Sequence, residues 1–206
     1  MGFYDNYLLP KVVHFMCGQN PAMKQREKIV PQAEGRVIEI GIGSGLNIPY
    51  YDPARVSHLW GLDPSRKMWD LAKKNARDHH LDAEFLESEA ESIPLDDNTA
   101  DTVVMTYTLC TIPDVHSALQ EIRRVLKPGG KLLFCEHGEA PDENVRRWQH
   151  RMNPVWNRLG GGCNLNRPIP GLLQDAGFRV ESQESMYLPG TPRFAGFNYW
   201  GTARQA

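Results

Sequence analysis

The segment Val37-Ile38-Glu39-Ile40-Gly41-Ile42-Gly43-Ser44-Gly45-Leu46-Asn47 decides the fold that we expect for this chain. Its β-branched residues predict a buried parallel strand, and its alternating glycines predict a tight turn that opens a helix. Because glycine lacks a Cβ, a ligand can lie against this backbone, and amides at the start of the helix can point toward it. The segment therefore indicates a nucleotide-binding loop.

Two familiar nucleotide-binding patterns do not fit this loop. The fingerprint of nicotinamide and flavin enzymes needs its third glycine at the position of Leu46. A phosphate loop needs Lys followed by Ser or Thr, which this segment lacks. A glycine loop alone can also be only a tight strand-to-helix turn, so its meaning depends on the residues that come after it in the chain.

The strongest support for interpreting this segment as a nucleotide-binding loop comes from Asp63. It lies 18 residues beyond Gly45, close to the roughly 20 residues expected for an acid that binds ribose hydroxyls at the tip of the next strand. Its carboxylate can accept two hydrogen bonds from a vicinal diol. The alternative is that Asp63 only caps a helix expected over 65–79. Together with the glycine loop, the spacing favours the ribose role.

The rest of the chain predicts a Rossmann-like α/β fold, a seven-stranded and mostly parallel sheet with helices on both faces and an antiparallel last strand. Strands are expected over 36–40, 56–62, 83–86, 101–106, 131–136, 178–187 and 194–203, and helices over 21–34, 65–79, 115–126, 142–159 and 169–176. With 206 residues we expect one domain. It divides into a helical flap (1–35), a cofactor-binding core (36–136), a substrate-wall insertion (137–170), and a C-terminal helix with a strand pair (171–206).

Composition excludes several classes of protein. A net charge of −2 gives no general attraction to nucleic acid or membranes. The four cysteines, Cys17, Cys110, Cys135 and Cys163, form no C-x-x-C pair, which argues against a zinc cluster and a disulfide framework. Apolar runs are too short for a signal sequence or a membrane span. We therefore expect reduced thiols, no metal and a cytoplasmic protein.

The segment 142–170 is locally basic, with five arginines against two acids. Apolar residues recur with helical spacing, which predicts a helix kinked or broken near Pro154; they are Val145, Trp148, Met152, Val155 and Leu159. Such a helix can bind an anionic substrate, rest on an anionic membrane surface or be a solvated face. The sequence leaves these alternatives and the oligomeric state open.

Residues 36–136 resemble the core of class I S-adenosylmethionine (SAM)-dependent methyltransferases. The resemblance rests on the acid followed by Gly-x-Gly-x-Gly, on Asp63, and on Leu126-Lys127-Pro128-Gly129-Gly130 after a helical stripe. It implies an enzyme that uses SAM, and it places Glu89 after the third strand, beside the adenine, where the family more often has Asp. The cofactor contacts that we expect are Glu39, Gly41, Gly43, Gly45, Asn47, Asp63, Pro64, Met68, Glu89, Ala90, Thr106 and Tyr4.

Three further segments narrow the resemblance. Glu136-His137, Thr108-Leu109-Cys110 and Gly162-Cys163-Asn164-Leu165-Asn166-Arg167 resemble a bacterial group related to thiol S-methyltransferase-like proteins, with more distant similarity to quinone and phosphatidylethanolamine methyltransferases. This implies methyl transfer to a small molecule, with thiol sulfur as the leading acceptor and an amine, a phenol or quinone, or a phospholipid headgroup as alternatives. A non-catalytic cofactor-binding module is an alternative of another class.

Residues near the carboxyl ends of the fourth and fifth strands, and in the later glycine-rich loop, are expected to face the acceptor; they are Tyr107, Cys110, Cys163 and Asn164. His137 is the candidate general base, which an alcohol or phenol needs and a thiol does not, or else a structural residue. A nucleic-acid substrate is disfavoured because only 142–170 is basic and because Thr106-Tyr107-Thr108-Leu109 stands where base-methylating enzymes carry Asn-Pro-Pro-Tyr.

Overall fold

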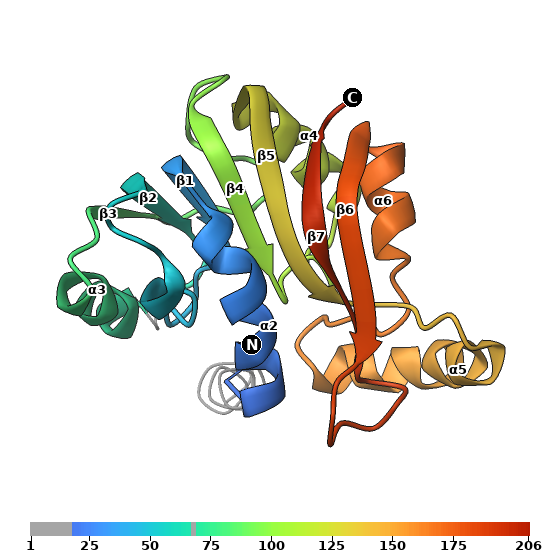
Figure 1. The fold of residues 1–206 in the computed structure, drawn as a ribbon. Helices are drawn as coiled ribbons and strands as arrows, with labels where there is room; N and C mark the ends of the chain where they lie inside the picture. Colours follow the sequence, from blue (N-terminus) through green and yellow to red (C-terminus); the bar gives the residue numbers. More distant parts are fainter. Residues whose placement is uncertain (1–17, 67–68) are drawn as a thin grey trace.

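The computed structural model describes residues 18–66 and 69–206. They form a seven-stranded sheet in the order β3-β2-β1-β4-β5-β7-β6 (Figure 1). The strands are β1 (Gly35–Ile40), β2 (Val56–Leu62), β3 (Ala83–Leu86), β4 (Ala100–Thr106), β5 (Leu126–His137), β6 (Phe178–Tyr187) and β7 (Phe197–Gln205). Strands β1 to β5 pair in parallel, and β7 runs antiparallel to both β5 and β6. The predicted Rossmann-like sheet is confirmed.

Helices cover both faces of this sheet (Figure 1). The α-helices are α2 (Asn20–Ile29), α3 (Trp69–Asp78), α4 (Val115–Val125), α5 (Glu143–Leu159) and α6 (Ile169–Asp175), and the 3₁₀ turns are η2 (Val30–Gln32) and η3 (Ile48–Tyr50). Among the described helices, none has both the length and the apolar character of a membrane span.

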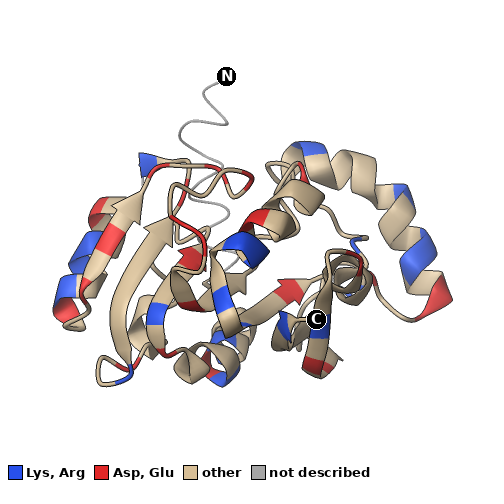
Figure 2. Cartoon of the chain, turned by 90° about the horizontal axis from the view of Figure 1, so that it is seen from above, with Lys and Arg blue, Asp and Glu red and all other residues tan. Residues whose placement is uncertain are grey.

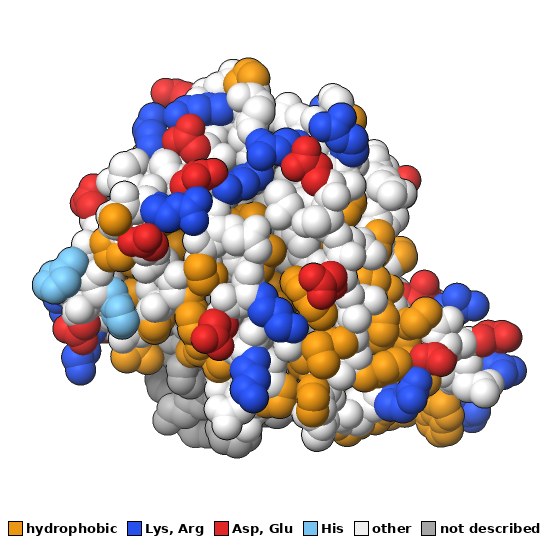
Figure 3. All heavy atoms as spheres, in the orientation of Figure 1, with side chains coloured by type: hydrophobic (Ala, Val, Ile, Leu, Met, Phe, Trp, Pro, Cys, Tyr) orange, Lys and Arg blue, Asp and Glu red, His pale blue; other side chains and the backbone are white. Residues whose placement is uncertain are grey.

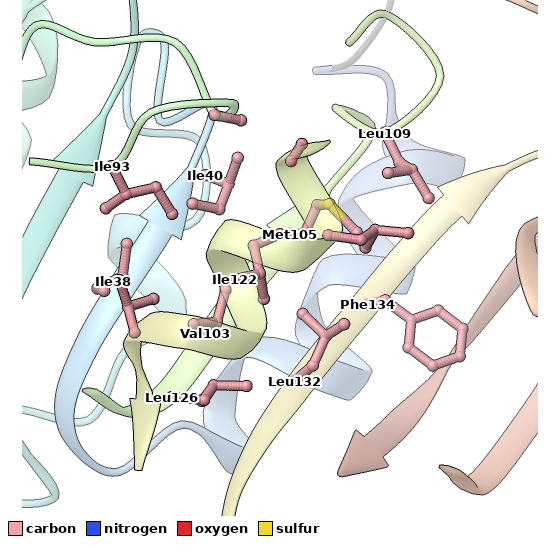
Figure 4. Packing of buried hydrophobic residues seen from close by; sticks show 14 of the residues in the cluster. Ile38, Ile40, Ile93, Val103, Met105, Leu109, Ile122, Leu126, Leu132 and Phe134 are labelled. Carbon is pink, nitrogen blue, oxygen red and sulfur yellow. The ribbon is translucent and has the colours of Figure 1, made fainter. Parts of the chain in front are cut away.

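Two apolar clusters lie on opposite faces because successive strand residues point to opposite sides. Val103 belongs to the cluster that α4 and α6 cover, whereas its neighbour Val104 belongs to the cluster under α2 and α3. Figure 4 shows Ile122 of α4 over the strand residues Ile38 and Val103. Both faces are therefore buried, as a central parallel sheet requires.

Several features of the fold differ from the prediction. The glycine loop leads into the short η3 turn and not into an α-helix, because Pro49 and Pro53 follow at once. The segment 127–130, which lies between the helix expected over 115–126 and the strand expected over 131–136, is an irregular start of β5. The last strand begins at Phe197 because residues 194–196 belong to a turn. Helix α5 continues through Pro154, since proline removes one hydrogen bond but its φ suits a helix.

Candidate functional site

A cavity of about 510 Å³ opens at the carboxyl ends of the parallel strands. The lining residues are Arg26 from α2 and residues 39–44, 46, 62–65, 88–91, 106–108, 111–113 and 160–161. Open α/β sheets bind ligands at this edge, and small-molecule pockets have volumes of roughly 300–1,000 Å³. The cavity is therefore the candidate site.

The glycine loop passes under this cavity. Gly41 and Gly43 have φ of +72° and +51°, a region that residues with a Cβ rarely adopt. A Cβ on Gly41 would lie 2.5 Å from Thr108, whereas a Cβ on Gly43 would have only Asp63 Oδ2 nearby, at 3.9 Å. Gly43 thus leaves its space to the cavity. Gly45 does not line the cavity, since its Cβ would meet Ile48 and Ala72.

Gly43→Ala is expected to weaken cofactor binding more than it destabilises the fold. The methyl group fills cavity space, and the positive φ costs roughly 1–2 kcal/mol. Gly129→Ala is the matched control because Gly129 has φ +79° and open space around its Cβ position. Calorimetric titration with SAM and thermal melts separate the two effects. Equal loss of affinity in both variants would contradict a ligand-facing role for Gly43.

Asp63 follows β2 with its carboxylate against the loop. Its Oδ2 accepts from Gly43 N at 2.9 Å and its Oδ1 from Ser65 N at 2.8 Å. Burial raises the pKa of Asp63, and these two backbone hydrogen bonds partly oppose the shift. No ion pair joins Asp63 to a cation in residues 18–66 and 69–206. Its carboxylate is oriented and lines the cavity.

A buried polar network lies beside the end of β1. Glu39 accepts hydrogen bonds from Asn47 Nδ2 at 3.0 Å and from Tyr51 Oη at 2.8 Å. Arg26 donates to Asn47 Oδ1 at 2.8 Å and to Thr106 Oγ1. Glu39, Arg26 and Thr106 line the cavity, whereas the fully buried Asn47 lies behind them and orients them.

Arg26 is a site residue that the sequence pattern did not predict. Its side chain is only 4% exposed, and its Nε is buried without a hydrogen-bond partner among the described residues. The sequence did contain a signal for it: Arg26 lies on the same face of α2 as Ala22 and Ile29, and this face packs inward. A cation at a core position of a helix needs a polar partner.

Glu39→Gln is expected to change how stability depends on pH. Burial raises the pKa of Glu39 from 4.5 to about 7. The folded state therefore holds the proton more tightly, so the stability that Glu39 contributes is complete below pH 4.5 and is lost as pH rises through 7. Relative to the parent chain, the Gln variant should gain roughly 3 kcal/mol at most across this range. Urea unfolding at several pH values measures the free energy of unfolding of both proteins. A difference between the two free energies that does not change with pH would contradict the prediction.

The far end of the cavity is formed by the loop after β3. Glu89 and the buried Ala90 line it, as does Pro64 after β2. The two other residues expected to contact the cofactor, Tyr4 and Met68, lie outside the described residues.

The opposite end is formed by the turn after β4 and the glycine-rich loop after α5. Tyr107 lines it with φ +54°, an uncommon conformation for a tyrosine. Glu136 holds this turn, since its Oε1 accepts from Thr108 N at 2.9 Å and Leu109 N at 3.1 Å. Burial raises the pKa of Glu136 to about 7.

Three other predicted residues meet just behind this end. Cys163 Sγ lies 3.7 Å from Cys110 Sγ and 3.6 Å from His137 Nε2. The hydrogen bond with Cys110, followed by the charge of His137, lowers the pKa of Cys163. Burial opposes the charged form of His137, but Cys163 and its hydrogen bond raise the pKa of the imidazole above its ordinary value. Their neighbours Thr111, Gly160 and Gly161 line the cavity.

Asn164, expected to face the acceptor, instead clamps the loop. Its Nδ2 donates to the carbonyl oxygens of Cys110 and Gly162 at 3.0 and 2.9 Å. Its Oδ1 accepts from Asn153 and Asn157 of α5 at 3.1 and 3.2 Å. The side chain does not line the cavity.

Helix α5 buries a polar side chain and leaves three of its five regularly spaced apolar side chains exposed. Gln149 is fully buried and donates to Gly138 O at 3.0 Å, whereas Trp148, Val155 and Leu159 are 58%, 54% and 61% exposed. The helix also carries the exposed basic side chains Arg147, Arg151 and Arg158. Figure 2 shows Lys and Arg positions along this helix, and Figure 3 shows apolar and basic side chains together at its surface. Membrane or substrate contact by this helix stays a prediction.

Comparison with known proteins identifies the family. The methyltransferase domain family matches residues 38–134. Thiol S-methyltransferase TMT1B of Homo sapiens is 33% identical over 200 residues, covering 92% of this chain and 81% of that protein. Demethylmenaquinone methyltransferase of Clavibacter sepedonicus is 30% identical over 120 residues, covering 58% and 48%.

A solved structure shares the fold. The SAM-dependent methyltransferase of Methanosarcina mazei superimposes with a TM-score of 0.64 at 22% identity, covering 84% of this chain and 93% of the other. The strand order, the cavity at the carboxyl edge and the similarity along most of the chain agree. This chain therefore belongs to the SAM-dependent methyltransferases, and it is an enzyme whose cofactor is SAM.

Proposed function

We propose that this enzyme methylates the sulfur of a small thiol. The observation that carries the proposal is the chemistry of the acceptor side of the cavity, formed by residues 106–108, 111–113 and 160–161. These residues are neutral, and none in this described set is a carboxylate or a basic side chain. A thiol with a pKa of about 8.5 supplies some thiolate near neutral pH, so it does not need a strong base. The similarity to a thiol S-methyltransferase supports the same acceptor.

The residues around the cavity fit SAM at both ends. An oriented carboxylate without a cationic partner among the described residues, Asp63, suits the ribose diol, and the bare Gly43 leaves space beside it. We assign Glu89 and Ala90, which line the far end of the cavity, to the adenine. At the other end, the buried guanidinium of Arg26 lines the cavity and suits the carboxylate of the methionine part. Glu39 suits its ammonium group.

The protein's part in the reaction is alignment and exclusion of water. Bound SAM supplies an electrophilic methyl carbon attached to a sulfonium. Arg26 would hold the methionine part of SAM and Asp63 its ribose, which fixes the direction of the methyl group. Thr108, Thr111 and Ile112 would surround the incoming sulfur on the acceptor side. Because the two reactants are already held in position, less translational and rotational entropy is lost on reaching the transition state, and the barrier is lower.

The test uses acceptors that differ in one atom. Thiophenol, phenol and aniline are incubated with the purified chain and SAM that carries an isotopically labelled methyl group, and products are identified by mass spectrometry. We expect label on sulfur and little on oxygen or nitrogen. The aliphatic set of 2-mercaptoethanol, ethylene glycol and ethanolamine separates the reacting atom from the preference for an aromatic ring.

Two results would reject the thiol assignment. Labelled methyl ether or methyl amine without thioether would move the acceptor to oxygen or nitrogen. Thioether formed at the same rate by Asp63→Ala, at SAM concentrations that do not saturate the parent enzyme, would show that the product does not arise in this cavity.

A further inference from the structure

Two thiols and an imidazole meet behind the acceptor side with the spacing of a metal site. The two sulfurs of Cys110 and Cys163 are 3.7 Å apart, and Cys163 Sγ is 3.6 Å from His137 Nε2. All three atoms lie within 4.8 Å of one another. Tetrahedral Zn²⁺, with Zn–S bonds of about 2.3 Å and Zn–N bonds of about 2.05 Å, implies edges of about 3.8 Å and about 3.6 Å. The two closest separations match these edges.

The groups are held in place by their surroundings. Backbone N and side-chain Nδ2 of Asn164 both donate to the Cys110 carbonyl, at 2.9 and 3.0 Å, which ties the loop that carries Cys163 to the turn that carries Cys110. Arg167 donates to the carbonyl oxygens of Leu109 and Ile112 on either side of Cys110. A ligand set fixed by hydrogen bonds to its neighbours is typical of metal centres.

We propose that Cys110, His137 and Cys163 bind one Zn²⁺ ion. Thiolate and imidazole are the preferred ligands of zinc, and Cys110 and His137 are only 3% and 9% exposed. The sequence spacing argued against a zinc cluster because the three residues stand 26 or 27 positions apart. The fold brings them together from the turn after β4, the end of β5 and the loop after α5.

Three protein ligands leave one tetrahedral position open, as in catalytic zinc sites. Thr111, Gly160 and Gly161 line the cavity beside the ligands, and we assign the open position to the acceptor. This step rests on the proposed thiol methylation. The substrate S–H bond breaks, its proton passes to solvent, and the thiolate binds the ion. The sulfur then attacks the methyl carbon, the bond to the sulfonium breaks, and the neutral thioether leaves. In this role His137 is a ligand and not a general base.

Cobalt substitution tests the site directly. The full chain, reduced with a phosphine and freed of metal, is titrated with Co²⁺ and followed by absorption spectroscopy, and Zn²⁺ is then added as competitor. We expect one Co²⁺ per chain, with the thiolate-to-cobalt charge-transfer band and the strong visible bands of tetrahedral cobalt, and displacement by Zn²⁺. Cys110→Ser and Cys163→Ser should lose the charge-transfer intensity and bind at least roughly 100-fold more weakly.

Cys135→Ser is the matched control, because Cys135 is a buried thiol of β5 outside the cluster. It should keep the cobalt spectrum. Calorimetry with SAM confirms that each variant remains folded and binds the cofactor. The metal proposal is overturned if the reduced parent chain shows no tetrahedral cobalt spectrum, or if Cys163→Ser keeps it. A Cys110–Cys163 disulfide after air oxidation, with no metal bound by the reduced protein, would overturn it too. None of these outcomes decides whether thiols are methylated, which the labelled-methyl assay measures separately.

Discussion

Asp63→Ala should weaken the binding of S-adenosylhomocysteine, the demethylated cofactor, by about two orders of magnitude. Two hydrogen bonds from a ribose diol to one carboxylate are lost, and hydrogen bonds to charged groups contribute about 1.5–3 kcal/mol each. The lower end of this range for two bonds, about 3 kcal/mol, corresponds to a change in Kd of somewhat over a hundredfold. The same carboxylate orients Gly43 and Ser65, so the local backbone also loses its anchor.

Isothermal titration calorimetry measures this effect, and a thermal melt of each variant shows whether the fold survives. Asp63→Asn keeps one acceptor oxygen and should lie between the parent and the alanine variant. Asp175→Ala, which removes an exposed carboxylate from α6, is the control and should bind as the parent does. An unchanged Kd for Asp63→Ala in a folded protein would remove the ribose role of this residue.

Arg26→Met should produce a second large loss, confined to ligands that carry the methionine part. A buried guanidinium that pairs with a carboxylate contributes about 2–5 kcal/mol by truncation, equivalent to a loss of affinity of roughly 30-fold to several thousandfold. Methionine keeps the length and the apolar contacts of the arginine stem but removes its donors to Asn47 and Thr106. Lys24→Met removes one positive charge from an exposed position of the same helix and is the matched control.

Two ligands distinguish the two ends of the cavity. S-adenosylhomocysteine has both the adenosine and the amino-acid parts, whereas 5′-methylthioadenosine has only the adenosine part and its sulfur. Arg26→Met should weaken the first and leave the second nearly unchanged, whereas Asp63→Ala should weaken both. Equal losses for both ligands in Arg26→Met would show that Arg26 acts by holding the network of Asn47 and Thr106, and not by pairing with a carboxylate.

The site could be predicted in part because some of its signals are local. The strand-turn at Gly41 and Gly43 and the acid at Asp63 follow from short-range pattern, and both line the cavity. Arg26 was missed because a single charged residue in an amphipathic helix is ordinarily solvated, and only the packing of α2 shows that it points inward. The apolar spacing of α5 correctly predicted a helix, but spacing does not say which face docks, and here Gln149 is buried while Trp148 is exposed.

The sequence by itself determined the alternation of strands and helices, the sheet with its antiparallel β7, and the cofactor edge around the glycine loop. Hydrophobic period, turn residues and short spacings carry that information within a few tens of residues. Only the tertiary structure brought Arg26 to Asn47 and Thr106, and only it showed that the sulfurs of Cys110 and Cys163 and a ring nitrogen of His137 lie within 4.8 Å of one another. The reason is physical: their proximity depends on strand order and on how a helix and a loop return over the sheet edge, and these long-range contacts leave no period or spacing in the linear chain.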